Sequence, residues 1–185
     1  DARAPVSSRN PEIIKYNKPR LLILSKKDLA DEGSVKKWLE YFKSDNSLAI
    51  AMDLNKGFNE KVIVNSINTL MKEKIERDRK RGIKNRPVRA MIVGIPNVGK
   101  STFINSYAGK ACTKTGNKPG VTKGKQWVRL SKEVEMLDTP GILWPKFEDP
   151  EVGMMLAYTG AVKEDIIDIE ELSCRLMTLL STYYP

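Results

Sequence analysis

The chain has 185 residues, 41% hydrophobic and 30% charged, which suits a single α/β domain with a substantial core. It contains no histidine, so a Ser-His-Asp triad, a Cys-His pair and a His-ligated zinc site are excluded within this chain. Its formal net charge of +9 favours a polyanionic partner such as nucleic acid. No apolar run approaches the roughly 18 residues that a membrane span needs.

The two cysteines, Cys112 and Cys174, lie far apart and show no metal-ligand spacing. They predict two free thiols in a reducing cytoplasm. The opening residues 1–5 read as the interior of a longer sequence, so we expect the chain to be a fragment.

The first half of the chain alternates predicted strands and helices. Residues 20–25 and 47–52 read as buried strands. Residues 33–43 predict a helix with Ser34 as its N-cap and with four apolar side chains on one face, Val35, Trp38, Leu39 and Phe42. Residues 59–81 predict one long helix that ends at Gly82, with apolar side chains spaced by threes and fours at Val62, Ile63, Ile67, Leu70, Met71 and Ile75.

The second half continues the alternation after a short polar linker. It is predicted to hold a strand (88–93), a helix (101–108), a mobile loop (110–124), a hairpin (125–130 with 134–137) and two closing helices (148–162 and 169–183). Strands that alternate with helices predict a three-layer α/β fold, with a mostly parallel sheet and helices on both faces.

Residues 94–101, Gly-Ile-Pro-Asn-Val-Gly-Lys-Ser, match the phosphate-binding pattern G-x-x-x-x-G-K-[ST] between a predicted strand and helix. In such a loop the backbone N–H groups point at phosphate oxygens, and the helix dipole adds to the attraction. The lysine, Lys100, reaches the β- and γ-phosphates, and the Ser101 hydroxyl is a candidate Mg²⁺ ligand. The predicted phosphate-binding residues are Asn97, Val98, Gly99, Lys100, Ser101, Thr102 and Gly141.

Two further segments predict a nucleotide-dependent switch. Asp138-Thr139-Pro140-Gly141 follows a predicted strand, and an acidic residue there is a natural second anchor for Mg²⁺. Gly141 lets its backbone N–H approach a γ-phosphate. Thr122 lies in the predicted mobile loop, where its hydroxyl can complete the Mg²⁺ shell when the γ-phosphate is present. Lys100, Thr122 and Gly141 are therefore the predicted catalytic residues.

Ser25-Lys26-Lys27-Asp28 follows the first predicted strand and resembles the guanine-specificity motif N-K-x-D. Asp28 can accept from guanine N1–H and N2–H₂, a donor pair that adenine lacks, and the stem of Lys26 can cover the base. Ser25 replaces the usual Asn, and its shorter side chain is expected not to make the same contact to the base and phosphate loop. Backbone N–H groups of Ala51 and Met52 are expected to contact guanine O6.

The order of these motifs is unusual. The guanine motif precedes the phosphate loop by 66 residues, from Asp28 to Gly94, whereas in ordinary GTPases it follows. This order resembles the circularly permuted P-loop GTPases of the YlqF/YawG family, most closely those active in ribosome biogenesis. Residues 1–11, D-A-R-A-P-V-S-S-R-N-P, resemble the family's D-A-R-x-P-x-S-S-R-N-P, and residues 94–101 and 138–146 resemble it too. The resemblance covers nearly the whole chain.

The resemblance implies a Ras-like fold for residues 1–165, with residues 166–185 as a closing helix that begins a C-terminal region. Family members usually have an N-terminal segment with a strand and a C-terminal helical RNA-binding domain, and both are expected to be absent from this chain. The resemblance further implies a cytoplasmic, monomeric GTPase that uses Mg²⁺ and assists assembly of the large (50S) ribosomal subunit, with its rRNA and proteins as partners.

Ile142 stands where Ras-like enzymes carry a water-orienting Gln, so hydrolysis is expected to be slow and stimulated by a partner. Asn97 is a candidate ligand for K⁺ near the phosphates; the alternative is that it only stabilises the turn. Trp38, Trp127 and Trp144 are expected to pack rather than to stack on bases. Two other functions stay open: a nucleotide-gated RNA- or protein-binding module with negligible turnover, and an ATP-specific P-loop protein.

Residues 72–86 hold eight basic residues against three acidic ones. Two interpretations of this segment stand: contact with rRNA phosphates, or a solvated helix end whose charge matches the helix dipole.

Overall fold

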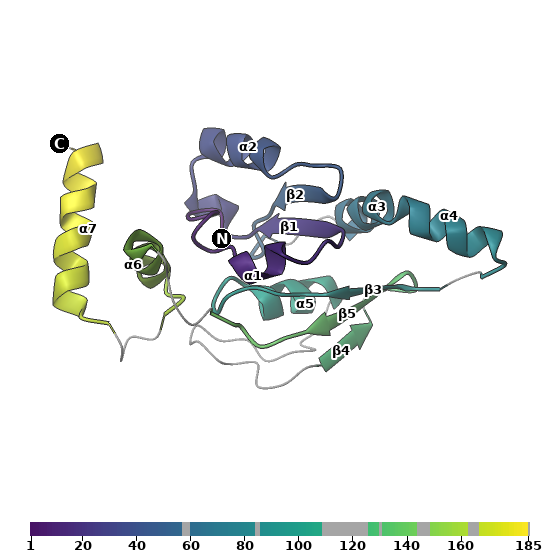
Figure 1. Cartoon of the computed structure of the whole chain (residues 1–185). Helices are drawn as coiled ribbons and strands as arrows, with labels where there is room; N and C mark the ends of the chain where they lie inside the picture. The colour runs from purple at the N-terminus through teal and green to yellow at the C-terminus, as the bar shows by residue number, and fades with distance from the viewer. Residues whose placement is uncertain are drawn as a thin grey trace.

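The computed structural model of the chain describes residues 1–56, 60–83, 86–108, 126–129, 131–143, 149–162 and 167–184. Helices and strands alternate along it (Figure 1), which confirms the predicted α/β class. In chain order the elements are α1 (Pro11–Ile14), β1 (Arg20–Leu24), the 3₁₀ helix η1 (Lys27–Leu29), α2 (Glu32–Tyr41), β2 (Ser47–Ala51), α3 (Glu60–Leu70), α4 (Lys72–Lys80), β3 (Val88–Met91), α5 (Lys100–Ala108), β4 (Gln126–Arg129), β5 (Val134–Asp138), α6 (Pro150–Tyr158) and α7 (Ile169–Tyr183).

The described strands form two sheets where one was expected. Strands β1 and β2 pair in parallel, with Leu22 opposite Ala49. In the second sheet β5 lies between β3, which is parallel to it, and β4, which is antiparallel. The antiparallel pair confirms the predicted hairpin, because a short connection can join only antiparallel neighbours. Within the described residues β1 and β3 do not pair with each other.

One hydrophobic core joins the two sheets. Its buried side chains come from the segment after β2, from α3 and α5, and from β4 and β5: Met52, Leu54, Ile63, Ile67, Phe103, Ile104, Val128, Val134 and Met136. Strand β5 turns alternate residues toward this core, as a strand at the surface of a core must. Because both sheets share the core, the loops that follow their strands are held in fixed positions relative to each other.

Helix α2 packs on the β1–β2 sheet through the predicted apolar face. Val35 and Phe42 are buried there, and Trp38 and Leu39 pack against them. The helix begins earlier than predicted, however, and its N-cap is Asp31, whose Oδ2 accepts from the Ser34 N–H at 2.6 Å. The prediction of Ser34 as N-cap is wrong because the carboxylate three residues earlier binds that amide first.

The predicted long helix is divided into α3 and α4 at Met71, which has φ −102° and ψ 9°. Hydrogen bonding continues through the break, since Met71 N–H donates to the Ile67 carbonyl and Ile75 N–H donates to the Met71 carbonyl, both at 2.9 Å. Ile63 and Ile67 are buried as predicted. Val62 is 44% exposed, so it lies off the buried face that Ile63 and Ile67 share.

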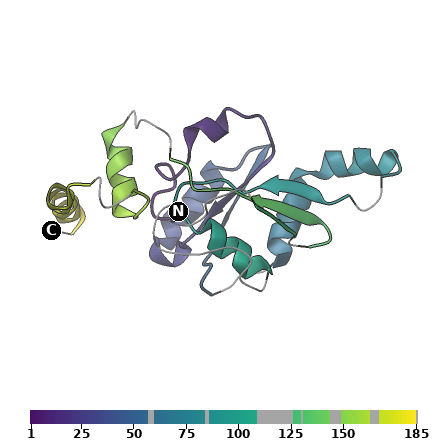
Figure 2. The same cartoon turned by 90° about the horizontal axis from the view of Figure 1, so that it is seen from below.

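The last two helices lie at the end of the molecule away from α4 (Figures 1 and 2). Helix α7 has the predicted bounds, whereas α6 ends early, at Tyr158, before Gly160 with φ +72°. Arg175 Nη1 of α7 lies 3.5 Å from Met154 Sδ of α6. The predicted boundary between residues 165 and 166 falls outside the described residues.

Candidate nucleotide-binding site

The segments that carry the predicted site follow the carboxyl ends of parallel strands. The guanine motif follows β1, the Ala51–Met52 segment ends β2, the phosphate loop follows β3, and Asp138 ends β5. In open parallel sheets, ligands bind in the crevice outside these strand ends. Direct contacts between the segments show that both sheets present their carboxyl ends to one place.

The phosphate loop, residues 94–101, turns through two positions with positive φ. Asn97 has φ 58°, in the left-handed region that asparagine tolerates, and Gly99 has φ 92°, which favours glycine. A Cβ on Gly99 would lie 3.1 Å from Leu54 Cδ1, so the loop is seated on the segment that follows β2. Helix α5 begins at Lys100, one residue before the predicted start, and Thr102 lies in its first turn.

Lys100 lies folded over its own loop, with Nζ donating to the Gly94 carbonyl at 3.1 Å and the Ile95 carbonyl at 3.0 Å. Burial lowers the pKa of Lys100, and the nearby Asp138 carboxylate opposes this shift. A phosphate replacing these two carbonyls would offer the ammonium a formal negative charge, which makes a stronger hydrogen-bonding partner.

Asp138 is fully buried, and neither of its carboxylate oxygens has a hydrogen-bond partner among the described residues. Burial raises the pKa of Asp138, and Lys100 offsets part of that rise. Buried carboxylates are normally satisfied, so an orphaned one at a strand end marks a place for a cation or its bound water. The donor type fits Mg²⁺, which prefers carboxylate, hydroxyl and water oxygens.

Ser25 connects the guanine motif to the phosphate loop. Its side chain is buried, and Oγ donates to the Val98 carbonyl at 2.6 Å. The expectation that Ser25 loses the contact of the usual Asn is therefore wrong for the phosphate loop, because the loop approaches closely enough for a hydroxyl to reach. The expectation for the base itself stays a prediction.

The two predicted guanine-contacting segments lie side by side. Lys27 N–H donates to the Met52 carbonyl at 3.3 Å, and Met52 N–H donates to the Leu24 carbonyl at 2.9 Å. Asp28 is exposed within η1, while Ala51 is half-buried at the end of β2. The Asp28 carboxylate thus lies at the surface beside the segment predicted to contact guanine O6.

An ion-pair cluster that no motif predicted supports this loop. Lys26, with φ 57°, places Nζ 3.3 Å from Asp1 Oδ2, and Arg3 Nη2 binds the same oxygen at 2.7 Å. The Asp1 side chain is only 2% exposed. Burial lowers the pKa of Lys26, with Arg3 adding to the shift and Asp28 opposing it. In the sequence, residues 1–3 (D-A-R) stood out only through the family resemblance, which gave no indication of these ion pairs.

The segment after β5 lies directly against the phosphate loop. A Cβ on Gly141 would come within 2.7 Å of the backbone of Pro96, so no larger residue fits at this position. Thr139 Oγ1 donates to the Ile92 carbonyl at 2.8 Å, and Ile142 N–H donates to the Gly94 carbonyl at 3.3 Å. The Ile142 side chain is 59% exposed.

Asn97 connects the phosphate loop to α6. Its Nδ2 donates to the Gly160 carbonyl at 2.7 Å, just beyond the helix end. Ile95, Leu156 and Ala161 form a buried cluster beneath this contact. Arg3 Nη2 reaches the neighbouring Thr159 carbonyl at 3.4 Å. The carboxyl end of α6 is thus bonded to both the phosphate loop and the D-A-R segment, an arrangement that no spacing in the sequence indicated.

The predicted loop over residues 110–124, which includes Cys112 and Thr122, falls outside the described residues, as does Trp144. Cys174 is a free, exposed thiol. No group of three or more Cys, Asp or Glu side chains suited to a metal ion occurs in the part of the chain that the structure describes. Nor does any described helix have the length and apolar character to span a membrane.

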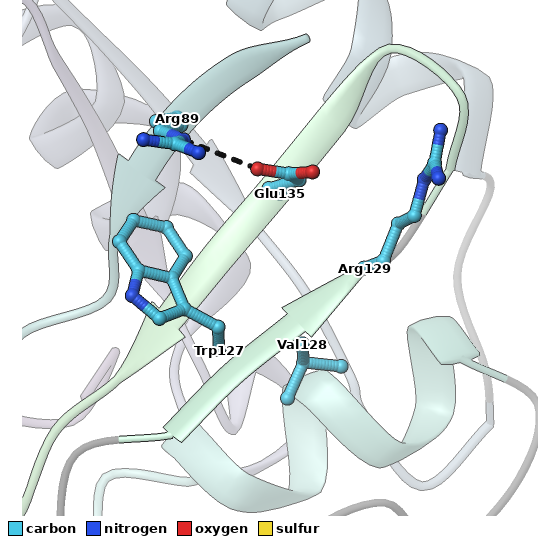
Figure 3. A pocket seen from close by; sticks show the side chains of 5 residues that line it. All are labelled: Arg89, Trp127, Val128, Arg129 and Glu135. Atoms are coloured by element: carbon cyan, nitrogen blue, oxygen red, sulfur yellow. Dashed lines mark hydrogen bonds and ion pairs between the residues drawn. The ribbon is translucent and has the colours of Figure 1, made fainter.

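A separate pocket of about 290 Å³ lies on the outer face of the β3–β5–β4 sheet (Figure 3), lined by Arg89, Trp127, Val128, Arg129 and Glu135. The Arg89 guanidinium lies 5.4 Å from the centre of the Trp127 ring, and its Nε lies 3.2 Å from Glu135 Oε2. Trp127 is 55% exposed, so its predicted packing role is wrong. Trp38 does pack, stacking on Phe42 at 5.6 Å.

Comparisons with known proteins agree with this geometry. A family model described as "50S ribosome-binding GTPase" matches residues 89–173. Ribosome biogenesis GTPase A of Priestia megaterium is 50% identical over 188 residues, which cover all of this chain and 65% of the relative. The Bacillus cereus protein of the same name is 48% identical over 187 residues, with 63% of its length covered. The chain thus spans slightly less than two thirds of these relatives.

Solved structures give the same result. GNP-bound YlqF from T. maritima has a TM-score of 0.69 and 30% identity, over 98% of this chain and 66% of that chain. The GDP-bound structure of TM YlqF has a TM-score of 0.65 and 30% identity, over 93% of this chain and 63% of that chain. With the guanine motif before the phosphate loop and both at one edge of the fold, the chain belongs to the circularly permuted P-loop GTPases of the YlqF type.

Proposed function

We propose that this chain binds GTP, hydrolyses it to GDP and phosphate, and serves in this way as the GTPase part of a large ribosomal subunit assembly factor. One observation carries the proposal: the hydrogen bond from Ser25 to the Val98 carbonyl holds the guanine motif against the phosphate loop. Because the two loops are held together, a base bound at Asp28 and phosphates bound at Lys100 can be parts of the same nucleotide.

The described residues support a division of roles. Backbone N–H groups of residues 97–102 and the Lys100 ammonium bind phosphate oxygens, and the N-terminus of α5 adds its dipole. Asp28 accepts from the guanine N1–H and N2–H₂. Lys26, positioned by Asp1, covers the base with its stem, and Lys27 fixes the loop through the Met52 carbonyl. Gly141 brings a backbone N–H toward the γ-phosphate.

The orphaned carboxylate of Asp138 supports Mg²⁺ as the resident cation. The Ser101 hydroxyl, Asp138 and Thr122 are the residues that would hold it, with Asp138 acting directly or through a bound water. When bound, the ion neutralises charge on the β- and γ-phosphates. The chain's own contribution is to position the phosphates and to present Lys100 to the developing negative charge.

The exposed Ile142 supports slow intrinsic hydrolysis and stimulation by the ribosome. A hydrocarbon side chain cannot orient the attacking water, so a partner surface must supply that group. Single-turnover hydrolysis with and without large ribosomal subunits tests this. Acceleration of at least ~10-fold by the particles is expected, whereas no turnover in either condition would favour the binding-module alternative.

The role of Asn97 divides into two testable possibilities. Its amide nitrogen is bonded to Gly160, and its positive φ suits a turn-stabilising residue. Its Oδ1 is the atom that a K⁺ ion would use near the phosphates. Turnover measured in KCl and in NaCl at equal ionic strength distinguishes them, since K⁺ coordination predicts faster turnover in KCl and equal rates leave only the structural role.

The ribosomal role comes from the relatives and from the net charge of +9. Because the chain spans less than two thirds of those relatives, the activity of a whole protein is part of the proposal. A monomer in the cytoplasm is expected for that role. Displacement of a bound, labelled guanine nucleotide by unlabelled GTP and by unlabelled ATP tests the proposed GTP binding. Displacement by ATP as effective as by GTP would favour the ATP-specific alternative.

A further inference from the structure

Helix α4 projects from the body of the molecule (Figures 1 and 2). It has no buried residue, whereas the preceding α3 is anchored in the core by Ile63 and Ile67. Hydrogen bonds that continue through Met71 transmit that anchoring to α4. The helix is therefore an extension anchored at one end, in which Ile75 and Asp78 are half-buried and the other side chains are exposed.

The far end of α4 is closed by a specific cap. Gly82 has φ +74°, its N–H donates to the Arg79 carbonyl at 3.0 Å, and Ile83 N–H donates to the Asp78 carbonyl at 3.0 Å. This pair of bonds is a Schellman motif, which satisfies carbonyls that would otherwise lack partners. A projecting helix with a defined end is pre-organised for contact with another molecule.

The basic side chains of α4 make no hydrogen bond or ion pair with other residues that the structure describes. From Lys72 to Arg81 there are six cations and three carboxylates. Glu73 and Arg77 have the spacing of a helical ion pair, as do Glu76 and Lys80, yet no ion pair in the described part of the chain involves α4. A polar helix without such pairs leaves its charges available to a partner.

Three of these cations follow one face of the helix. Lys74, Arg77 and Arg81 are separated by three and four residues, so they form a stripe that extends about 10 Å along the axis. All three are exposed. Arg77, Arg79 and Lys80 lie in the last turn, where the helix dipole explains a cation, but Lys72 and Lys74 lie in the first turn, where it does not.

We propose that α4 is an RNA-binding arm whose Lys74–Arg77–Arg81 face contacts backbone phosphates of ribosomal RNA. The identity of the RNA rests on the proposed function; the chemistry rests on unpaired, exposed cations along a rigid helix. The contact is with the backbone and is independent of base sequence, because the deep, narrow major groove of an RNA duplex keeps its base edges out of reach of side chains while its phosphates stay accessible.

The arm is separated from the nucleotide site by the course of the chain. Helix α4 precedes the first residue of β3, and the phosphate loop follows its last residue, so the two lie at opposite ends of that strand. Substitutions in α4 are therefore expected to leave GTP affinity unchanged, and GTP binding serves as an internal control.

The test uses the 185-residue chain loaded with a non-hydrolysable GTP analogue. The loaded chain is titrated, at several KCl concentrations, against large ribosomal subunits and separately against an RNA duplex. The duplex has about 20 base pairs, long enough to span two successive minor grooves. The test variant combines Lys74→Gln, Arg77→Gln and Arg81→Gln. The matched control combines Lys36→Gln, Lys37→Gln and Lys43→Gln, which removes three exposed cations from α2 and the residues after it. A third variant, Lys74→Arg with Arg77→Lys and Arg81→Lys, keeps the charge.

Removing one cation that neutralises a phosphate lowers the slope of log K against log[salt] by about one. The test variant is expected to flatten the slope by about two to three for both RNA ligands, while the control and the charge-keeping variant match the original chain. An unchanged slope in the test variant, or no binding of RNA by the original chain, would contradict the proposal that α4 binds RNA. Failure of the original chain to bind GTP, with α4-dependent RNA binding retained, contradicts the proposed GTPase function alone.

Discussion

At the scale of single residues, Ser25 is the connection between base recognition and phosphate binding. A buried hydroxyl donates to the carbonyl of Val98, across a sequence separation of 73 residues. The chain thus keeps with serine the loop-to-loop contact that the asparagine of N-K-x-D usually makes. A shorter side chain serves because Gly99 lets the phosphate loop approach the segment after β2 so closely.

Ser25→Ala should weaken GTP affinity by about fivefold, since a buried carbonyl left without its donor costs about 1 kcal/mol. The measurement is the Kd of a fluorescent GTP analogue. Ser173→Ala is the matched control, because that hydroxyl donates only to the Ile169 carbonyl of its own exposed helix. Equal affinities for the original chain and Ser25→Ala would show that the bond does not support the site.

The buried Asp138 carboxylate is expected to lower the stability of the nucleotide-free chain while supporting Mg²⁺-dependent nucleotide binding. Burial raises its pKa above the ordinary value of 3.8, so the stability linked to this group is present at low pH and is lost as pH rises through the raised pKa. Asp138→Asn removes that loss. It is expected to stabilise the nucleotide-free chain by about 1 kcal/mol at neutral pH while reducing Mg²⁺-dependent nucleotide affinity.

Chemical denaturation of the two proteins from about pH 4 to about pH 8, a range that brackets the titration of a carboxyl with a raised pKa, measures this effect. The difference in unfolding free energy should grow in favour of Asp138→Asn as the pH rises. Glu135→Gln serves as control on the same strand, because its side chain is 25% exposed and its carboxylate is paired with Arg89. A difference independent of pH would contradict the account of Asp138.

At the scale of elements, helix α6 is joined to the phosphate loop at its carboxyl end. The bond from Asn97 to the Gly160 carbonyl joins the loop to the end of this helix, and α7 follows next. Movement of the loop on nucleotide exchange would therefore reach α6 directly.

Asn97→Gly keeps the positive φ of the loop but removes the donor to Gly160. Amide hydrogens of residues 156–162 are expected to exchange about five to ten times faster, because the helix end loses about 1 kcal/mol of anchoring. Thr159→Val is the control, since that side-chain hydroxyl bonds only to carbonyls within α6. Unchanged exchange rates in Asn97→Gly would show that the bond to the phosphate loop does not stabilise the end of α6.

Most elements could be predicted from their sequence pattern, and the misses have physical causes. Helix α7 and the β4–β5 hairpin follow local periodicity. Helix α1 was not predicted, although Asn10 caps it and Pro11 occupies its first turn, because four residues are too few for a periodic pattern. The break at Met71 leaves nearly all backbone hydrogen bonds intact, so no breaker residue marks it.

At the scale of the whole molecule, motif order indicated the permuted arrangement, and fold contacts do not depend on where a chain is cut. Motifs identified the phosphate loop, Asp138 and the guanine loop, because their chemistry is local. The Asp1–Arg3–Lys26 cluster and the Asn97–Gly160 bond could not be predicted, since each joins residues through tertiary packing that leaves no spacing in the sequence.

The central claim is that Asp28 and Lys100 bind opposite ends of one guanine nucleotide. Its most direct test is displacement of a fluorescent GDP analogue by GTP, ATP and XTP from the original chain, Asp28→Asn and the exposed control Asp45→Asn. Asparagine can donate to the xanthine C2 carbonyl, so Asp28→Asn is predicted to lose GTP preference by more than ~10-fold and to gain XTP binding, while the control stays GTP-specific. Unaltered GTP preference in Asp28→Asn would contradict the account.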